Sequence, residues 1–236
     1  MANTNPGFSR SPREQLELAF ERGFEWSFDA RLSPAPQGDA RHSAVLILFG
    51  ELDRIPAEAQ GLRAVRVPPG LDVLLLRRSD GLRNHAGQIA FPGGGVEAAD
   101  ADRAATALRE AEEETGLEPG GVDVLGLLPD AHIPVSNYIV TPVLGWWRLP
   151  SEVAADLAES VEVFRVPVAE LLDPAARGTS VLRHEGRSYR GPAFRLGSRF
   201  GGHLVWGFTA ILLDRIFDAL EWEEPWDRSR LFEVAR

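Results

Sequence analysis

The sequence predicts a layered α/β or α+β domain. Short apolar runs typical of buried strands alternate with amphipathic segments of helical periodicity along the 236-residue chain. Hydrophobic residues make up 44% of the chain and charged residues 25%, a balance that allows a substantial core. No internal repeat or shift in composition divides the chain. We therefore expect residues 1–35 to form an N-terminal extension and residues 36–236 a single domain.

Three segments have the periodicity and end signals of helices. The first begins with Ser11 as N-cap and Pro12 at the first helical position, and runs to about Gly23. The second covers residues 101–115 and is followed by Gly116, a common helix terminator. The third is an amphipathic segment near residues 205–220.

The strands are predicted from apolar runs and alternating patterns. The predicted strands cover residues 44–49, 71–76, 122–128, 138–147 and 161–166. A further short strand is expected between residues 56 and 70, and residues 171–196 predict a helical turn followed by a hairpin. The FPGGG segment at 91–95 predicts a tight turn, because glycine allows positive φ and lets the backbone approach a ligand.

Charge and composition exclude several classes of function. A formal net charge of -10 argues against nucleic acid as the main partner, and the absence of cysteine excludes disulfides, zinc–thiolate sites and cysteine nucleophiles. The N-terminal residues have no apolar signal region, and no stretch approaches the length of a membrane-spanning helix. We expect a cytoplasmic protein with a small-molecule substrate and neither nucleic-acid nor membrane partners. The oligomeric state is open, with a homodimer as one option.

A row of carboxylates marks the second predicted helix. Glu110, Glu113 and Glu114 stand at i, i+3 and i+4, so they share one face of the helix. Their mutual repulsion needs compensation, which hard cations such as Mg²⁺ or Mn²⁺ provide, because these ions prefer carboxylate and water ligands. The alternative is a solvated face of a surface helix. The glycine segment upstream favours the metal site, since it offers backbone oxygen and room for a diphosphate.

Residues 91–117 resemble the Nudix box. The second half of the box matches at Arg109, Glu110, Glu113, Glu114, Gly116 and Leu117, with Ala111 at the first aliphatic position. The first half departs from the pattern, because Ala101 stands where the first glutamate is expected when counting back from Arg109. Counting forward from Gly94 reaches Asp100 instead. The simplest interpretation is a one-residue insertion with Asp100 replacing that glutamate, and Glu97 is the second candidate.

The resemblance implies a Nudix-type mixed β-sheet between helices and a metal-dependent hydrolase that cleaves a diphosphate. Glu113 and Glu114 are implied as primary ligands of Mg²⁺ or Mn²⁺, with Glu110 beside them and the carbonyl of Gly93 as a backbone ligand. Arg109 is expected to orient a carboxylate through a charge-assisted hydrogen bond. The implied chemistry is attack of a metal-activated water on one phosphorus.

Residues 74–94 are similar to the signature that precedes the box in the coenzyme A (CoA) pyrophosphatase branch. The matching positions are Arg78, Ser79, Leu82, Arg83, His85, Gly87, Gln88, Ile89, Ala90, Phe91 and Pro92. Leu76 stands in place of a threonine, and Arg77 fills a variable position. Residues 136–147 and 205–216 resemble further segments of the same branch.

This branch implies cleavage of CoA, or its acyl forms, to 3′,5′-ADP and 4′-phosphopantetheine. Arg78 and Arg83 suit the phosphates of such a substrate, because a planar guanidinium matches phosphate oxygens. Surface salt bridges are the alternative for both. His85 and Gln88 are expected to orient the substrate or to bond the loop backbone.

The resemblance also implies a further carboxylate that completes the metal site or acts as general base. Glu159 stands shortly before the Val163–Pro167 segment, where the branch carries a glutamate, and Glu162 and Glu152 are its competitors. Two other functions are open: a Nudix hydrolase of ADP-ribose or another nucleoside diphosphate derivative, and a Nudix module that binds a nucleotide without cleaving it. The intact glutamates weigh against the binding module.

Overall fold

The computed structural model describes residues 10–23, 39–51, 67, 70–81, 85–134, 136–156, 160–184 and 186–234. The strand expected between residues 56 and 70 falls in a stretch of which only Val67 and Gly70 are described. The predicted site residues Arg83 and Glu159 lie outside the described residues.

Two sheets and four α-helices make up the described fold. The helices are α1 (Pro12–Arg22), α2 (Arg103–Thr115), α3 (Val168–Leu172) and α4 (Gly207–Ala219). The first sheet has the order β3 (Ile89–Ala90), β2 (Leu71–Arg78), β1 (Arg41–Glu51), β7 (Tyr138–Trp147) and β5 (Val122–Leu127). Three strands pair beside this path: β4 (Gly93–Gly95) with β1, β6 (Ala131–Ile133) with β7, and β8 (Ser160–Pro167) with β2.

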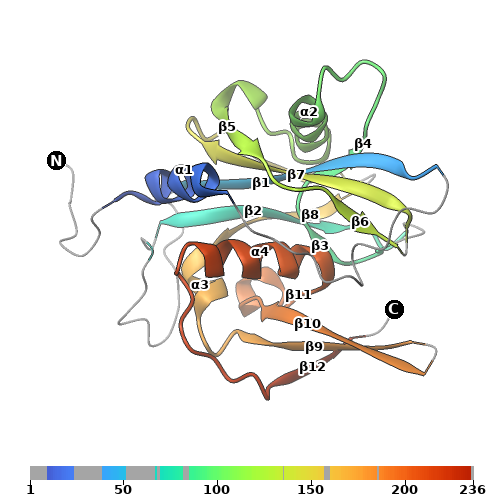
Figure 1. Cartoon of the computed structure of the whole chain (residues 1–236), viewed down its shortest axis with the longest axis vertical. Helices are drawn as coiled ribbons and strands as arrows, with labels where there is room; N and C mark the ends of the chain where they lie inside the picture. The colour runs from blue at the N-terminus through green and yellow to red at the C-terminus, as the bar shows by residue number, and fades with distance from the viewer. Residues whose placement is uncertain are drawn as a thin grey trace.

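The second sheet has the order β11 (Leu204–Val205), β10 (Arg187–Arg195), β9 (Arg177–His184) and β12 (Leu231–Val234). Helix α2 lies on one face of the first sheet, and α4 lies between the other face and the second sheet (Figure 1). The predicted mixed sheet between helices is therefore confirmed.

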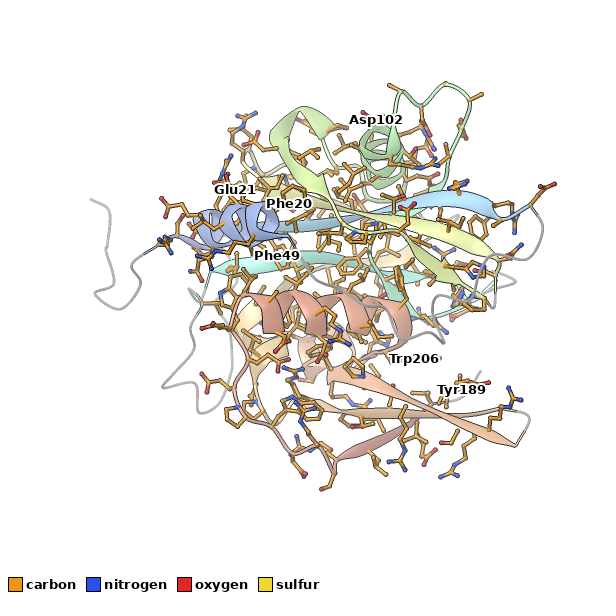
Figure 2. All side chains as sticks on the ribbon, in the orientation of Figure 1. Phe20, Glu21, Phe49, Asp102, Tyr189 and Trp206 are labelled. Atoms are coloured by element: carbon orange, nitrogen blue, oxygen red, sulfur yellow. The ribbon has the colours of Figure 1, made fainter. Side chains whose placement is uncertain are left out.

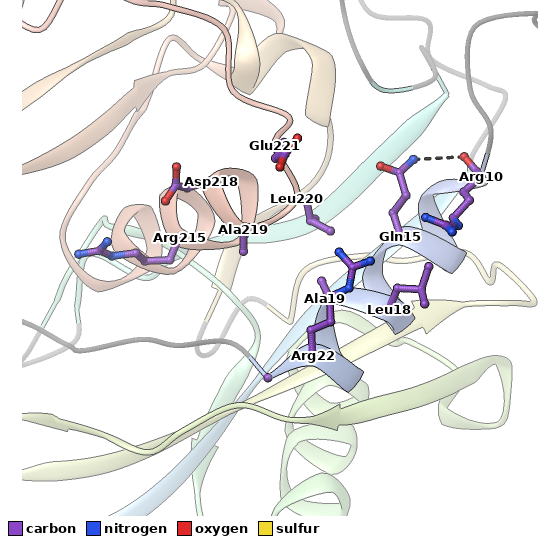
Figure 3. Close-up of a pocket in the computed structure, with 11 residues that line it drawn as sticks. Arg10, Gln15, Leu18, Ala19, Arg22, Arg215, Asp218, Ala219, Leu220 and Glu221 are labelled. Carbon is purple, nitrogen blue, oxygen red and sulfur yellow. Dashed lines mark hydrogen bonds between the residues drawn. The ribbon is translucent and has the colours of Figure 1, made fainter.

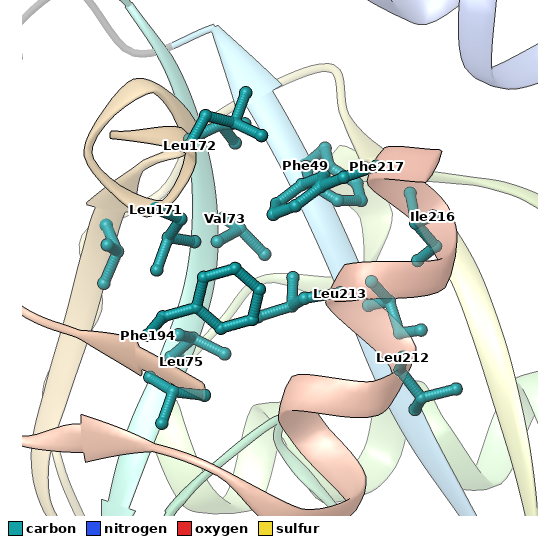
Figure 4. Close-up of a cluster of buried hydrophobic side chains, with 14 of the residues drawn as sticks. Phe49, Val73, Leu75, Leu171, Leu172, Phe194, Leu212, Leu213, Ile216 and Phe217 are labelled. Atoms are coloured by element: carbon teal, nitrogen blue, oxygen red, sulfur yellow. The ribbon is translucent and has the colours of Figure 1, made fainter. Parts of the chain in front are cut away.

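Strand alternation divides the buried side chains of the described residues into two clusters. Leu46 and Leu48 of β1 pack with α2, whereas Ile47 and Phe49 pack with α4 and the second sheet (Figure 4). On β2, Leu74 belongs to the α2 side, and its neighbours Val73 and Leu75 belong to the α4 side. This alternation decides which polar side chains at the end of β2 can reach α2.

Helix α1 contributes to the larger of these clusters. Leu16 is fully buried there, and the Trp222 indole donates a hydrogen bond of 2.8 Å to the Gln15 side chain. Phe20 lies against β5 (Figure 2). Helix α1 therefore packs with the same core as the strands, while the domain boundary at residue 35 stays a prediction.

A buried arginine joins the second sheet to α4. Arg177 is 1% exposed and forms ion pairs with Asp214 of α4 and, at 2.7 Å, with Glu223. Its guanidinium also lies over the Phe194 and Trp226 rings, 4.9 Å from each centroid. Paired carboxylates and aromatic faces together compensate the loss of water around this cation.

The local signals in the sequence predicted most helix and strand positions. Ser11 caps α1 through a capping box, and Gly116 ends α2 in the left-handed conformation, as expected. The tight turn predicted at 91–95 is wrong, because Gly93–Gly95 forms β4 and pairs antiparallel with Ser43–Val45. A run of glycines has no side-chain periodicity, so a strand made of it leaves no pattern in the sequence. In the described ranges, no helix combines the length and apolar character of a bilayer crossing.

Asp72 is a buried carboxylate within β2. It is 1% exposed, between Gly50 of β1 and Pro167 of β8, and neither carboxyl oxygen accepts a hydrogen bond from the described residues. Burial raises the pKa of Asp72 to about 7, against the opposing attraction of Arg165 and Arg199. The folded state therefore binds the proton of this group more tightly than the unfolded chain does.

The raised pKa predicts a pH-dependent effect of Asp72→Asn. Stability contributed by the neutral form is present at about pH 4 and is lost as the pH rises through about 7, because the unfolded chain ionises first. The substitution should therefore raise the free energy of unfolding by roughly 1–3 kcal/mol at about pH 8 and change it little at about pH 4. Urea unfolding of both proteins at the two pH values measures this difference.

Asp123→Asn is the control of opposite sign. Hydrogen bonds from Arg148 and Arg13 lower the pKa of Asp123, so its removal should lower stability at about pH 8. An Asp72→Asn effect of equal size at both pH values would show that Asp72 carries no unfavourable charge in the fold.

Candidate active site

Helix α2 places Glu114 against the glycine strand β4. The N-cap of this helix is Asp102, whose carboxylate accepts a hydrogen bond of 2.8 Å from the Ala105 N–H (Figure 2). The Glu114 side chain is 3% exposed, and its Oε2 accepts a hydrogen bond of 2.8 Å from the Gly93 N–H. The backbone N–H of Gly93 thus orients Glu114 within the site.

Glu110 lies one helical turn before Glu114 and approaches the same strand. Its side chain is 12% exposed, and a Cβ built on Gly94 would stand 2.4 to 2.5 Å from its carboxyl atoms. No side chain could therefore be accommodated at Gly94 without displacing the carboxylate or the strand. Glycine is therefore required at this position of the segment. The segment forms a strand rather than the predicted turn.

Arg109 joins the carboxylates of α2 to the segment that precedes the helix. Its Nη1 lies 3.0 Å from Glu110 Oε1 and 3.1 Å from Glu113 Oε2. Its Nε and Nη2 donate to Asp100 at 3.0 and 3.1 Å, and Nη2 also donates to the Gly95 carbonyl at 2.9 Å. One guanidinium thus contacts Asp100, Glu110, Glu113 and the end of β4, while the orienting role of Arg109 stays a prediction.

Asp100, the residue at the irregular position of the box, serves as the main anchor of Arg109. Its side chain is 5% exposed and also accepts hydrogen bonds from the Glu97 N–H and the Thr106 hydroxyl, both at 2.9 Å. The hydrogen bonds from Arg109, followed by that from Glu97 N–H, hold the pKa of Asp100 well below its ordinary value. Thr106 was not predicted, because a threonine inside a helix carries no sequence signal of such a contact.

The described residues do not by themselves form a complete set of metal ligands. Glu113 is 58% exposed at the rim of the site, while Glu110 and Glu114 are covered. Within the described ranges, no group of three or more His, Asp or Glu side chains is arranged to hold a metal ion. Arg109 lies between Glu110 and Glu113 and neutralises part of their charge.

Arg78 brings the upstream signature to the carboxylates. It is the last residue of β2, and its Nη1 lies 3.9 Å from Glu114 Oε1. Beyond it, His85 Nδ1 and Gln88 Oε1 are 3.0 Å apart, so these two side chains bond each other within the loop. This is a contact between two side chains rather than with the loop backbone, and the expected roles of His85 and Gln88 stay predictions.

The candidates for the general base differ in position. Ser160 and Asp156, which flank the undescribed residues 157–159, both donate hydrogen bonds to the Glu114 carbonyl, at 2.9 and 3.1 Å. Glu162 pairs with Arg77 in the β2–β8 ladder, and it contacts Arg77 and His203 on the α4 side of the sheet. Glu162 therefore faces away from Glu114, and Glu152 is an exposed residue.

A cavity of about 410 Å³ opens elsewhere, between α1 and the C-terminal end of α4 (Figure 3). Its lining includes Gln15, Arg22 and Arg215, and no residue of α2, β2 or β4. It is therefore separate from the glutamate site.

The site defines a class of protein: an α+β protein in which a glutamate-bearing helix, a glycine strand and an arginine-bearing strand converge on one face of a mixed sheet. The family model described as NUDIX domain matches residues 60–183. The chain belongs to the Nudix family of hydrolases, enzymes that act on phosphorus-containing acid anhydrides.

Proteins named "Uncharacterized Nudix hydrolase NudL" are similar in sequence. The Escherichia coli protein is 41% identical over 152 residues, covering 61% of this chain and 72% of the relative. The Photorhabdus laumondii protein is 32% identical over 192 residues, covering 80% of this chain and 91% of the relative.

Two solved structures illustrate the structural comparison. The NUDIX domain of Shewanella oneidensis NrtR complexed with ADP ribose is 19% identical with a TM-score of 0.43, covering 61% of this chain and 82% of that chain. A MutT/nudix family protein from Enterococcus faecalis is 16% identical with a TM-score of 0.45, covering 91% and 77%.

The close approach of Glu110 to β4 predicts the effect of Gly94→Ala. The added methyl group should displace the carboxylate, so diphosphate hydrolysis should fall about 10–100-fold. Overpacking should lower the free energy of unfolding by about 1–3 kcal/mol. Steady-state kinetics and urea unfolding measure the two effects.

Gly95→Ala is the matched control, because a Cβ there meets nothing within 4 Å and the carbonyl that Arg109 contacts is retained. Equal activity of the two variants would show that the fit between Gly94 and Glu110 has no catalytic importance.

Proposed function

We propose that this Nudix hydrolase cleaves the diphosphate bond of CoA or a CoA derivative, releasing 3′,5′-ADP and 4′-phosphopantetheine or its acyl form. The observation that carries the proposal is the 3.9 Å approach of Arg78 to Glu114. It brings the segment that resembles the CoA-pyrophosphatase signature next to the glutamates of the Nudix box. A substrate whose diphosphate reaches Glu114 would meet the Arg78 guanidinium at the same point.

Nudix hydrolases generally use divalent metal ions. The donor chemistry here fits Mg²⁺ or Mn²⁺, since Glu110, Glu113 and Glu114 supply hard oxygen atoms and Gly94 leaves room for the Glu110 carboxylate. We propose these three glutamates and the Gly93 carbonyl as members of the ligand set, which the described residues alone do not complete. When bound, such ions lower the pKa of water and neutralise charge that develops on phosphate oxygens.

The residues of the chain have separate tasks in this proposal. The Gly93 N–H and Arg109 orient the glutamates through the hydrogen bonds described above. Arg78 and Arg83 bind substrate phosphates, and His85 and Gln88 shape the loop between them and β3. Glu159 removes a proton from the attacking water, which the attachment of both flanking residues to the Glu114 carbonyl supports.

The positive charge of the two arginines favours CoA over ADP-ribose as the substrate. Arg78 and Arg83 precede the glycine strand in the sequence, and two such cations would suit a substrate with an additional phosphate, which CoA carries on its ribose and ADP-ribose lacks. The substrate is a small molecule in this proposal, and the cytoplasmic location stays a prediction. Hydrolysis of ADP-ribose or another nucleoside diphosphate derivative is the second candidate, and binding without cleavage is the third.

Substrate choice is tested with purified protein, Mg²⁺ or Mn²⁺, and a panel of diphosphates with product identification. We expect a higher kcat/KM for CoA than for dephospho-CoA or ADP-ribose, by roughly ten- to a hundredfold, because one charged hydrogen bond contributes about 1.5–3 kcal/mol. Arg83→Ala should narrow the difference between CoA and dephospho-CoA. Equal cleavage of all three substrates would exclude the CoA assignment and leave the family assignment intact.

The general base is tested by Glu159→Gln. The variant should remain folded and lose on the order of 10²–10⁴-fold in kcat, because it can no longer accept a proton. Glu152→Gln, a change of the same type at an exposed position, is the control and should retain full activity. Kinetics across pH, with circular dichroism to confirm folding, measure the result. A Glu159→Gln variant as active as the control would rule out this role.

A further inference from the structure

Arg77 is one residue before Arg78 on β2, and strand alternation directs it to the opposite face of the sheet. It does not share the α2 face with Glu114. Its Nη2 lies 2.8 and 3.0 Å from the two carboxyl oxygens of Asp80, and its Nη1 lies 3.6 Å from Glu162 of β8. The Arg77 side chain is 21% exposed, whereas those of Asp80 and Glu162 are 71% and 43% exposed. Arg77 therefore connects the segment after β2 to the neighbouring strand β8.

The segment between β2 and β3 has a backbone that needs external support. His85 has a φ of 58° and Gly87 a φ of 68°, both in the left-handed region, which is unfavourable for a residue other than glycine. Two hydrogen bonds close its base: Gly87 N–H to the Arg78 carbonyl at 3.2 Å, and Arg78 N–H to the Gln88 carbonyl at 3.0 Å. Such a conformation persists only where surrounding contacts maintain it.

The Arg77–Asp80 pair supplies such a contact. A Cβ built on Gly87 would stand 2.7 Å from Asp80 Oδ1 and 3.9 Å from Arg77 Nη2, so the ion pair lies directly against the Gly87 backbone. Removal of the pair would take this side-chain contact away from the Gly87 backbone and leave its backbone hydrogen bonds in place.

The contacts of Arg77 continue through Glu162 to the turn before β11, a strand of the second sheet. Glu162, which contacts Arg77, lies 3.5 Å from the Nε2 of His203, in the turn that leads to β11. The His203 ring in turn lies 6.1 Å from that of Phe164, a residue of the large core cluster. Arg77 is thus supported by β8 and by the turn before β11.

We propose that Arg77 is a positioning residue: it holds the Asp80 and Gly87 backbone so that Arg78 and the His85–Gln88 pair are pre-arranged for the substrate. Arg77 fills a variable position of the signature that precedes the Nudix box. Its side chain points away from Glu114 and so does not contact the glutamates. The kinetic consequence of this inference rests on the proposed function, whereas the structural consequence does not.

The kinetic test uses Arg77→Ala with CoA as substrate. A loosened loop should raise KM about tenfold and change kcat less than about threefold, because the glutamates on the α2 face are untouched. Mn²⁺ binding, measured by electron paramagnetic resonance, should be unchanged. Arg77→Lys retains a cation beside Asp80, so its KM should be close to that of the wild type.

The matched control is Arg148→Ala, which breaks a comparable ion pair with Asp123 (3.0 Å) at the far end of β7. It should leave KM unchanged. Asp80→Asn should reproduce most of the effect of Arg77→Ala, which also removes the contact with Glu162. The double variant should be no worse than Arg77→Ala alone, because both substitutions remove the Arg77–Asp80 interaction. Additive effects of the two substitutions would overturn the proposal.

Hydrogen exchange provides a readout that is independent of activity. The Gly87 N–H and the Arg78 N–H close the loop, so their exchange should accelerate at least about tenfold in Arg77→Ala and Asp80→Asn, but not in Arg148→Ala. Exchange within α2 should stay unchanged. If the wild type cleaves no diphosphate, the proposed function fails while this measurement still decides the role of Arg77. Unchanged exchange of the two amides would overturn it.

Discussion

The site depends on one guanidinium. Three glutamates on one helix face repel each other, and two of them, Glu110 and Glu114, are covered by the glycine strand, where the loss of water makes charge more costly. Arg109 offsets this repulsion by contacting Glu110 and Glu113, and it is itself held in place by Asp100. Without the Asp100–Arg109 pair, Glu110 and Glu113 would lose the cation between them, whereas Glu114 would keep its hydrogen bond from the Gly93 N–H.

The glycine strand is the second requirement. A strand of ordinary residues would project side chains toward α2 and separate the helix from the sheet. Gly94 leaves the space that the Glu110 carboxylate occupies, and the Gly93 N–H donates to Glu114. The same absence of side chains allows β4 to pair with β1 beneath the helix, so the backbone can approach a ligand at this point.

Strand β2 separates two tasks through two consecutive arginines. Arg78 turns toward α2 and approaches Glu114, whereas Arg77 turns toward α4 and contacts Asp80 and Glu162. The first side chain can meet a substrate and the second can support the loop that follows. A shift of one residue in register would exchange the faces on which Arg77 and Arg78 lie. The register of the β2–β8 pairing therefore determines which arginine faces Glu114.

The features that the sequence alone determined are local ones. Ser11 and Gly116 mark helix ends because caps depend on a few neighbouring residues, and the shared face of Glu110, Glu113 and Glu114 follows from helical spacing. The Nudix family could likewise be inferred from this window, and the match over residues 60–183 confirmed it. The tertiary structure decided what depends on pairing between distant segments: that Gly93–Gly95 is a strand against Ser43–Val45, that Asp100 anchors Arg109, and that Glu162 faces away from Glu114. Sequence spacing cannot show these relations, because it does not determine which strands pair, or in which register.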